Sequence, residues 1–176
     1  LRATTSGALE PSKLVVMPTN LHRAPERRRT RDAWRLVANG AVVPGVDRLI
    51  AHGARAVFRP ERGRRLTARS VPEARDLVRH AFADVGGNGN LARSWATFAR
   101  RWPSSAWRDL LDLYSQIDVP VLLLWADDDH LHPLAGAEEA LDLLPDAQLR
   151  VLSGTGYLIA YDDPVGVARE LAAFSV

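Results

Sequence analysis

A short apolar run that ends in a cluster of carboxylates constrains this chain most strongly. Residues 119–133 read VPVLLLWADDDHLHP, so the apolar run from Val121 to Trp125 is followed, after Ala126, by three aspartates. A run of this length, bounded by Pro120 and an acidic cluster, is typical of a strand buried on both faces of a parallel sheet. Because open α/β sheets bind ligands outside the carboxyl ends of their strands, we expect the three aspartates at a functional crevice.

Two other short apolar segments predict further strands of the same sheet, at Lys13–Met17 (KLVVM) and Gln148–Leu152. Helices are predicted over Leu134–Leu144 and after Asp163-Pro164, where the aspartate supplies a cap and the proline suits a first turn. Strands alternate with helices towards the end of the chain, and roughly a hundred residues of helical pattern separate the first two strands. This order predicts an α/β fold with a parallel sheet that carries a large insertion.

The insertion shows several helix signals. Ser70 and Glu73 form a capping box before an apolar stripe, which predicts a helix start with Pro72 in its first turn. Aromatic and aliphatic residues recur at helical spacing in 91–102 and again in 107–117. Such stripes are typical of a buried helix face, and the other interpretation is that some of the rings line a pocket for an apolar substrate.

Length and composition limit the class of protein. A chain of 176 residues suits one domain with a real core. It contains no cysteine, which excludes disulfides, thiolate metal sites and a cysteine nucleophile. No apolar run approaches the ~18 residues of a membrane span, and no signal-peptide pattern opens the chain. We therefore expect a soluble, cytoplasmic protein without a membrane partner.

The charges are unevenly distributed along the chain. Residues 1–115 hold 21 basic and 10 acidic side chains, whereas residues 116–176 hold 2 basic and 11 acidic ones. The two parts could attract each other within one fold, or the basic part could face an anionic ligand. The arginine-rich segment Leu21–Arg31 has no interleaved aromatic residues, so we expect no nucleic-acid partner.

The last sixty residues carry a family resemblance. IDVPVLLLWADDD, a helix, LPDAQLRVLSGTGYLIAYDDP and a final helix resemble the carboxyl-terminal part of the α/β-hydrolase fold, where members read PvLllwGxxDxxxP and LPxAxlxxlpGxGH. KLVVMPTN resembles the strand that follows the nucleophile region. The resemblance implies a partial α/β-hydrolase fold with a short parallel sheet of about three strands. Residues 1–20 and 119–176 would form its core, and residues 21–118 a helical cap inserted after the first strand.

The resemblance assigns roles to two residues. Asp129 falls on the position of the triad acid, which orients the catalytic imidazole and stabilises the charge it gains. The alternative is that Asp129 only caps the next helix or binds loop amides. Tyr157 occupies the position of the triad histidine. A phenol, with an ordinary pKa of about 10, cannot take a serine proton at neutral pH as an imidazole does.

The nucleophile is a second departure from the family. No G-x-S-x-G elbow occurs in the 176 residues, and the family layout would place it before Leu1. The resemblance implies a hydrolase acting on a small, largely apolar ester, epoxide or related substrate, with background activity for this chain alone; whether the chain is itself an enzyme stays open. The alternative is a non-hydrolytic ligand-binding or lyase/cyclase-like relative in which Tyr157 donates a hydrogen bond.

Two histidines flank the acid. His132, beside Pro133, is expected to face solvent or to cap, and the other interpretation is a surrogate base. The Asp127–Asp129 cluster with His130 and His132 contains metal-ligand types. Adjacent residues in one loop cannot all point at one ion, so we expect neither a metal nor a cofactor.

The first predicted strand has no predicted neighbour on its outer side. An unpaired apolar edge is a template for association. Besides a small-molecule substrate or ligand, we therefore expect self-association, or pairing with a missing amino-terminal half, through residues 13–17.

Overall fold

The computed structural model describes residues 2–19, 66–69, 71–85 and 112–175, together with positions 39, 40, 43, 45, 46, 49, 90, 93, 94 and 97. The predicted cap residue Ser70, the arginine-rich segment and most of the two predicted aromatic stripes lie outside these residues. The chain divides into two compact units. The first comprises Leu1–Ala24, Arg65–Val71 and Ser105–Val176, and the second comprises Pro25–Arg64 and Pro72–Ser104.

The first unit also includes residues 65–71 and 105–118, which the sequence analysis assigns to the cap. Two physical reasons are visible. Tyr114 and Ile117 are buried in the core of the first unit, and Ala68 and Arg69 donate backbone hydrogen bonds to Asp162.

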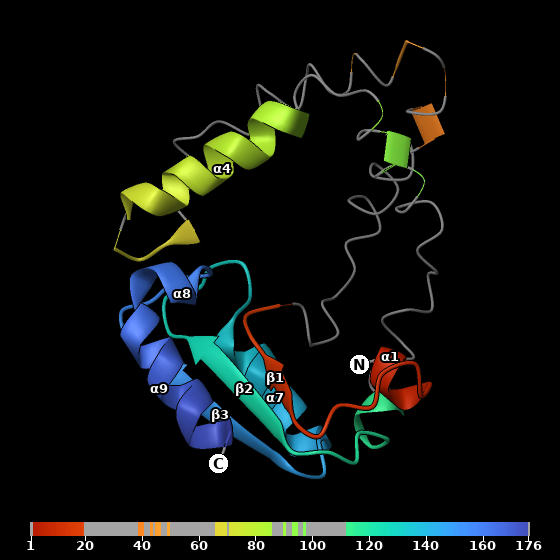
Figure 1. Ribbon diagram of the computed structural model, residues 1–176, viewed down its shortest axis with the longest axis vertical. Coiled ribbons are helices and arrows are strands. Elements are labelled where there is room, and N and C mark those ends of the chain that lie inside the picture. Colours follow the sequence, from red (N-terminus) through yellow and green to blue (C-terminus); the bar gives the residue numbers. More distant parts are fainter. Residues whose placement is uncertain are drawn as a thin grey trace. The chain divides into compact units, whose positions relative to one another are not determined.

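The first unit is built on a three-stranded parallel sheet (Figure 1). Its strands are β1 (Leu14–Val16), β2 (Val121–Ala126) and β3 (Ala147–Leu152), in the order β1-β2-β3. Val121 pairs with Leu14 on one side and with Ala147 on the other. The predicted parallel sheet, its three strands and the interior place of the 121–126 strand are all confirmed.

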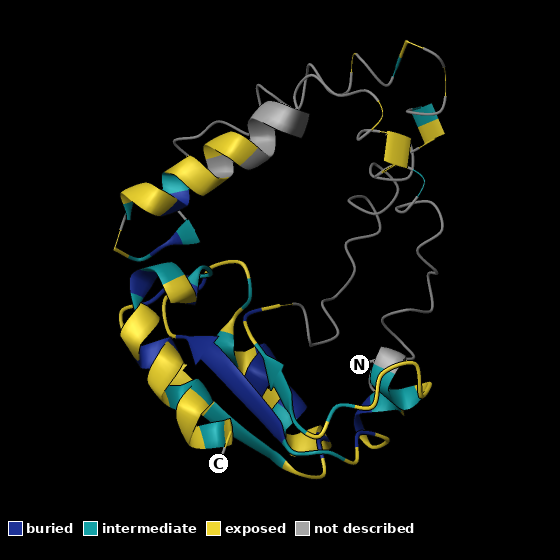
Figure 2. Cartoon of the chain, in the orientation of Figure 1, coloured by how far each residue is buried: buried dark blue, intermediate teal, exposed yellow. Residues whose placement is uncertain are grey.

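Strand β2 is buried along its whole length, as Figure 2 shows. Its odd-numbered side chains pack with α7 (Leu134–Leu143), and its even-numbered ones pack with α8 (Ile159–Asp162) and α9 (Pro164–Ser175). Successive side chains of a strand point to opposite faces, so a strand covered on both faces must be apolar throughout. This is why the sequence shows an unbroken run here and no alternation.

The helix boundaries follow from local signals. Asp163 caps α9, because its Oδ1 accepts a 2.8 Å hydrogen bond from the backbone N–H of Gly166, and Pro164 is the first helical residue. In the second unit, α4 (Pro72–Val85) begins at the predicted proline. A short helix, α1 (Arg2–Thr5), lies near the start of the chain. Within the described part of the chain, no helix is long and apolar enough to cross a bilayer.

Candidate active site

Asp129 lies in the loop that leaves the carboxyl end of β2. Its side chain is 1% exposed, and its Oδ1 accepts hydrogen bonds from the backbone N–H groups of Leu131 (2.7 Å) and His132 (3.0 Å). These bonds close the loop on itself. Asp129 does not cap α7, whose N-cap is Pro133 without a side-chain hydrogen bond among the described residues.

His132 uses the second oxygen of this carboxylate. Its Nδ1 lies 3.1 Å from Asp129 Oδ2, and its side chain is only 13% exposed. The indole Nε1–H of Trp125 donates a 2.9 Å hydrogen bond to the carbonyl of His132. The expectation that His132 faces solvent is therefore wrong. Three residues after the acid, the tight loop turns the imidazole back onto the carboxylate that closes it.

The pair has a defined chemistry. A carboxylate facing Nδ1 favours the tautomer with the proton on Nδ1 and leaves Nε2 with a free lone pair. Within the residues described, no group hydrogen-bonds to Nε2 of His132. An imidazole held in this way can accept a proton at Nε2, and its neighbouring carboxylate stabilises the charge that forms.

Tyr157 lies in the turn after β3 and reaches the same site. Its ring centroid is 4.9 Å from that of His132, with the two ring planes inclined by 35°. The two loops are also joined by a 3.0 Å hydrogen bond from the N–H of Asp128 to the carbonyl of Thr155. The loop of Asp129 and the turn of Tyr157 thus meet at one end of the sheet, and His132 lies between the two side chains named by the resemblance.

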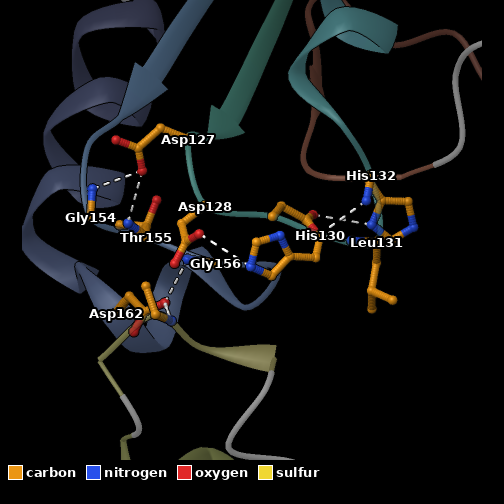
Figure 3. A network of polar contacts seen from close by, with 11 residues as sticks. Asp127, Asp128, His130, Leu131, His132, Gly154, Thr155, Gly156 and Asp162 are labelled. Atoms are coloured by element: carbon orange, nitrogen blue, oxygen red, sulfur yellow. Dashed lines mark hydrogen bonds and ion pairs between the residues drawn. The ribbon is translucent and has the colours of Figure 1, made fainter.

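Asp127 fixes the turn that carries Tyr157 (Figure 3). Its Oδ1 accepts hydrogen bonds from the N–H groups of Gly154 (2.8 Å) and Thr155 (3.3 Å). Slight burial acts to raise the pKa of Asp127, but hydrogen bonds from Ser153, Thr155 and Gly154 outweigh it and hold the pKa below its ordinary value. Gly154 has φ +68°, a left-handed conformation that favours glycine.

A buried carboxylate that the sequence analysis missed, Asp162, holds a distant segment against this turn. Its Oδ2 accepts hydrogen bonds from the N–H groups of Gly156 (Figure 3) and Ala68, both at 2.8 Å. Its Oδ1 accepts one from the N–H of Arg69 at 3.0 Å. Residue 156 must be glycine, since a Cβ there would lie 2.9 Å from the backbone nitrogen of Ala68. No local pattern could reveal Asp162, because two of its partners lie more than ninety positions earlier in the sequence.

His130 and Asp128, from the same loop, are more exposed to solvent. His130 Nε2 lies 3.3 Å from Asp128 Oδ1, with the two side chains 85% and 55% exposed. Such a solvated pair contributes little to stability. Among the described residues, no group of three or more ionisable metal-ligand side chains is placed to hold an ion.

Comparison with known proteins identifies the fold. No protein-family profile matches the sequence. The structure is similar to that of a thermophilic esterase from Thermogutta terrifontis, with 22% identity, a TM-score of 0.62, and coverage of 93% of this chain and 55% of that one. It is similar also to the 2-hydroxy-6-oxo-6-phenylhexa-2,4-dienoate hydrolase of Rhodococcus sp. strain RHA1, with 14% identity, a TM-score of 0.68, and coverage of 99% and 59%.

A third similar structure is an α/β-hydrolase fold protein from Burkholderia ambifaria, with 19% identity, a TM-score of 0.66, and coverage of 97% of this chain and 59% of that one. The chain thus spans a little more than half the length of the proteins it resembles. From the parallel sheet, the order of its elements and these likenesses, we conclude that the chain has the α/β-hydrolase fold and spans part of it.

Proposed function

We propose that this chain forms the cap and carboxyl-terminal core of an α/β-hydrolase-like protein that acts on a small, largely apolar ester, epoxide or related substrate. One observation carries the proposal: at the carboxyl end of the central strand, the buried Asp129 carboxylate faces an imidazole nitrogen at 3.1 Å. A carboxylate–imidazole pair at this end of the sheet is the arrangement that hydrolytic proton transfer requires. Residues 21–118 are proposed as the helical cap.

The proposal includes a limit on this chain alone. Its 176 residues contain no G-x-S-x-G elbow, and residue 157 is a tyrosine. A serine hydrolase depends on a hydroxyl held on such an elbow and activated by a base. We therefore expect the chain by itself to turn over esters slowly, and through no serine intermediate.

The test measures binding and turnover separately. The chain is titrated with a non-hydrolysable apolar ketone, 4-phenyl-2-butanone, and with styrene oxide, while the NMR signals of His132 and Tyr157 are followed. Initial rates with 4-nitrophenyl acetate are recorded in parallel. We expect saturable shifts at both residues, slow turnover and no burst of nitrophenolate. The absence of shifts with both compounds would overturn the proposal, and rapid turnover lost in Asp129→Ala would overturn its limit.

A second function is favoured by Tyr157 itself. A tyrosine at the position of the family's histidine, stacked on His132, suits a site that binds a ligand or runs lyase- or cyclase-like chemistry through a phenol hydrogen bond. Tyr157→Phe and Tyr157→His separate the two functions. If the hydroxyl holds a ligand, Tyr157→Phe weakens binding of the ketone roughly 5-fold or more, as for one lost hydrogen bond. If the site is hydrolytic, that affinity holds, and Tyr157→His raises ester turnover in a longer protein that also contains the upstream region.

A further inference from the structure

We propose that His132 is the general base of this site, supplied by the acid's own loop in place of the histidine that the fold usually carries at position 157. The inference rests on the proposed function and deepens it by naming the residue that moves the proton. Asp129 and Trp125 are its positioning residues.

The first argument is that the two oxygens of the Asp129 carboxylate have different partners. One oxygen is used by the N–H groups of Leu131 and His132, which fixes the carboxylate relative to the loop. The other oxygen is thereby aimed at Nδ1 of His132. A carboxylate needed only to close the loop would not also require a largely enclosed imidazole against its second oxygen.

The second argument is the number of points at which His132 is held. Its N–H is bound by Asp129, its carbonyl by the indole of Trp125, and its ring by Asp129 Oδ2 and the ring of Tyr157. Both backbone groups, the Nδ1 edge of the ring and the position of the ring beside Tyr157 are therefore set by neighbours. Precise placement of this kind is what general-base catalysis demands of a side chain.

The third argument is the contrast between the two histidines of the loop. His130 pairs with the exposed Asp128 and is itself 85% exposed, so water competes for both partners. His132 pairs with a carboxylate that is 1% exposed. An electrostatic interaction is stronger where water is excluded, so the contact between His132 and Asp129 is the better protected of the two.

The chemical step needs no component beyond ester and water. Nε2 of His132 accepts a proton from a water molecule as the water oxygen forms a bond to the ester carbonyl carbon. The tetrahedral intermediate then collapses, the bond from carbon to the alkoxy oxygen breaks, and Nε2 returns the proton to the departing alkoxide. A carboxylic acid and an alcohol leave, and the imidazole is neutral again.

The test uses the 176-residue chain and two readouts. Nitrogen-15 NMR of the imidazoles reports the tautomer, and the slow rate with 4-nitrophenyl acetate reports the base. We expect the Nδ1–H tautomer for His132 and a mixed tautomer in Asp129→Asn. We expect His132→Gln to lower this slow rate to that of buffer without protein, because it removes the base. His130→Gln is the matched control and keeps the wild-type rate.

Each outcome decides the proposal. The ring of His132 is retained in Asp129→Asn, so an unchanged tautomer there would overturn the assignment even if His132→Gln failed to fold. Binding of 4-phenyl-2-butanone together with a rate indifferent to His132→Gln would overturn the base assignment alone. Failure of that ketone and of styrene oxide to bind would overturn the proposed function and the base assignment with it.

Discussion

The indole N–H of Trp125 donates a 2.9 Å hydrogen bond to the backbone carbonyl of His132, seven residues further along the chain. Trp125 is the fifth residue of β2, and its side chain is buried in the cluster that contains Tyr114 and Ala137. The indole therefore has an apolar body in the core and a polar edge at the loop. Through this one side chain, the packing of the core determines where the loop of the candidate site lies.

Trp125→Phe removes this donor and leaves a partly buried carbonyl without it. We expect a loss of about 2–4 kcal/mol in the free energy of unfolding, from the unmade hydrogen bond and the smaller ring. Urea unfolding measures the loss, and the NMR signals of His132 should move. Leu123→Ala, in the same cluster, is the control: it should cost a similar amount while those signals stay in place. Unmoved His132 signals in Trp125→Phe would contradict the positioning role.

Asp162→Ala leaves three backbone N–H groups without their acceptor. We expect it to cost about 2–4 kcal/mol, because buried donors left unsatisfied are expensive. Hydrogen exchange should quicken at the amides of Ala68, Arg69 and Gly156. Asp163→Ala is the matched control, since it removes only the cap of α9, costs about 1 kcal/mol and exposes the amide of Gly166 instead. If the amides of residues 68 and 69 exchanged equally slowly in both variants, the role of Asp162 in holding this segment would be contradicted.

Substitutions of the two glycines of the turn, Gly154 and Gly156, should destabilise the protein for different reasons. A Cβ at Gly156 would meet backbone atoms of residues 66–68 at 2.9–3.2 Å, so any larger residue should destabilise by about 1–3 kcal/mol. Gly154 has room for a side chain but a φ of +68°. Asparagine tolerates that conformation better than alanine. The melting temperature of Gly154→Asn should therefore be higher than that of Gly154→Ala. The melting temperature of Gly156→Asn should be no higher than that of Gly156→Ala.

Acid should weaken the turn through Asp127. Its pKa is lowered in the folded state, so the ionised form binds the turn better than the protonated one. The contribution to stability is then complete above the ordinary pKa of about 3.9 and is lost as the pH falls through the lower folded value. Melting temperatures between pH 6 and pH 2 should show this loss in the wild type. In Asp127→Asn, the stability should start lower at pH 6 and fall less, and an identical decline in both would contradict the assignment.

Strand β1 is an edge of the sheet within the described residues, and we propose that this edge associates with a second copy of the chain or with a partner strand. Size-exclusion chromatography should show association that increases with concentration. Met17, exposed next to β1, offers a test: Met17→Lys places a charge at the edge and should favour the monomer. Leu77→Lys adds the same charge at an exposed position of α4 and serves as control. A stable monomer across dilutions of the wild type would contradict the proposal.

The sequence alone predicted the features whose causes are local. The unbroken apolar run of β2 reports burial on both faces, and the Asp163-Pro164 pair reports the start of α9. Asp129 was placed at the correct end of the sheet because it follows a strand directly. Its proposed catalytic role came from the resemblance and stays a prediction.

The features that could not be predicted depend on distant partners. The sequence analysis expected His132 to face solvent or to cap, with a surrogate base as the other interpretation. It could not place the side chain, because the hydrogen bond from Trp125 and the ring of Tyr157 reach it only once the strand and the two loops have packed. Asp162 directly precedes the cap residue of α9 in the sequence. Ala68 and Arg69 reach its carboxylate through backbone N–H groups, which any residue except proline would supply, and the side-chain hydrogen bonds of Arg69 go to carbonyls, so no residue type marks this contact in the sequence.

The hydrogen bonds that the Asp162 carboxylate accepts from Ala68, Arg69 and Gly156 have a consequence for engineering. Because Asp162 binds main-chain N–H groups, most side chains could stand at position 68 without weakening the contact, whereas the guanidinium of Arg69 also donates hydrogen bonds to the carbonyls of Gly154 and Asp162. In sequence, residues 65–71 separate the two stretches of the second unit. Any redesign of residues 66–69 must therefore keep the carboxylate at 162 and the glycine at 156, since both hold this segment to the turn after β3.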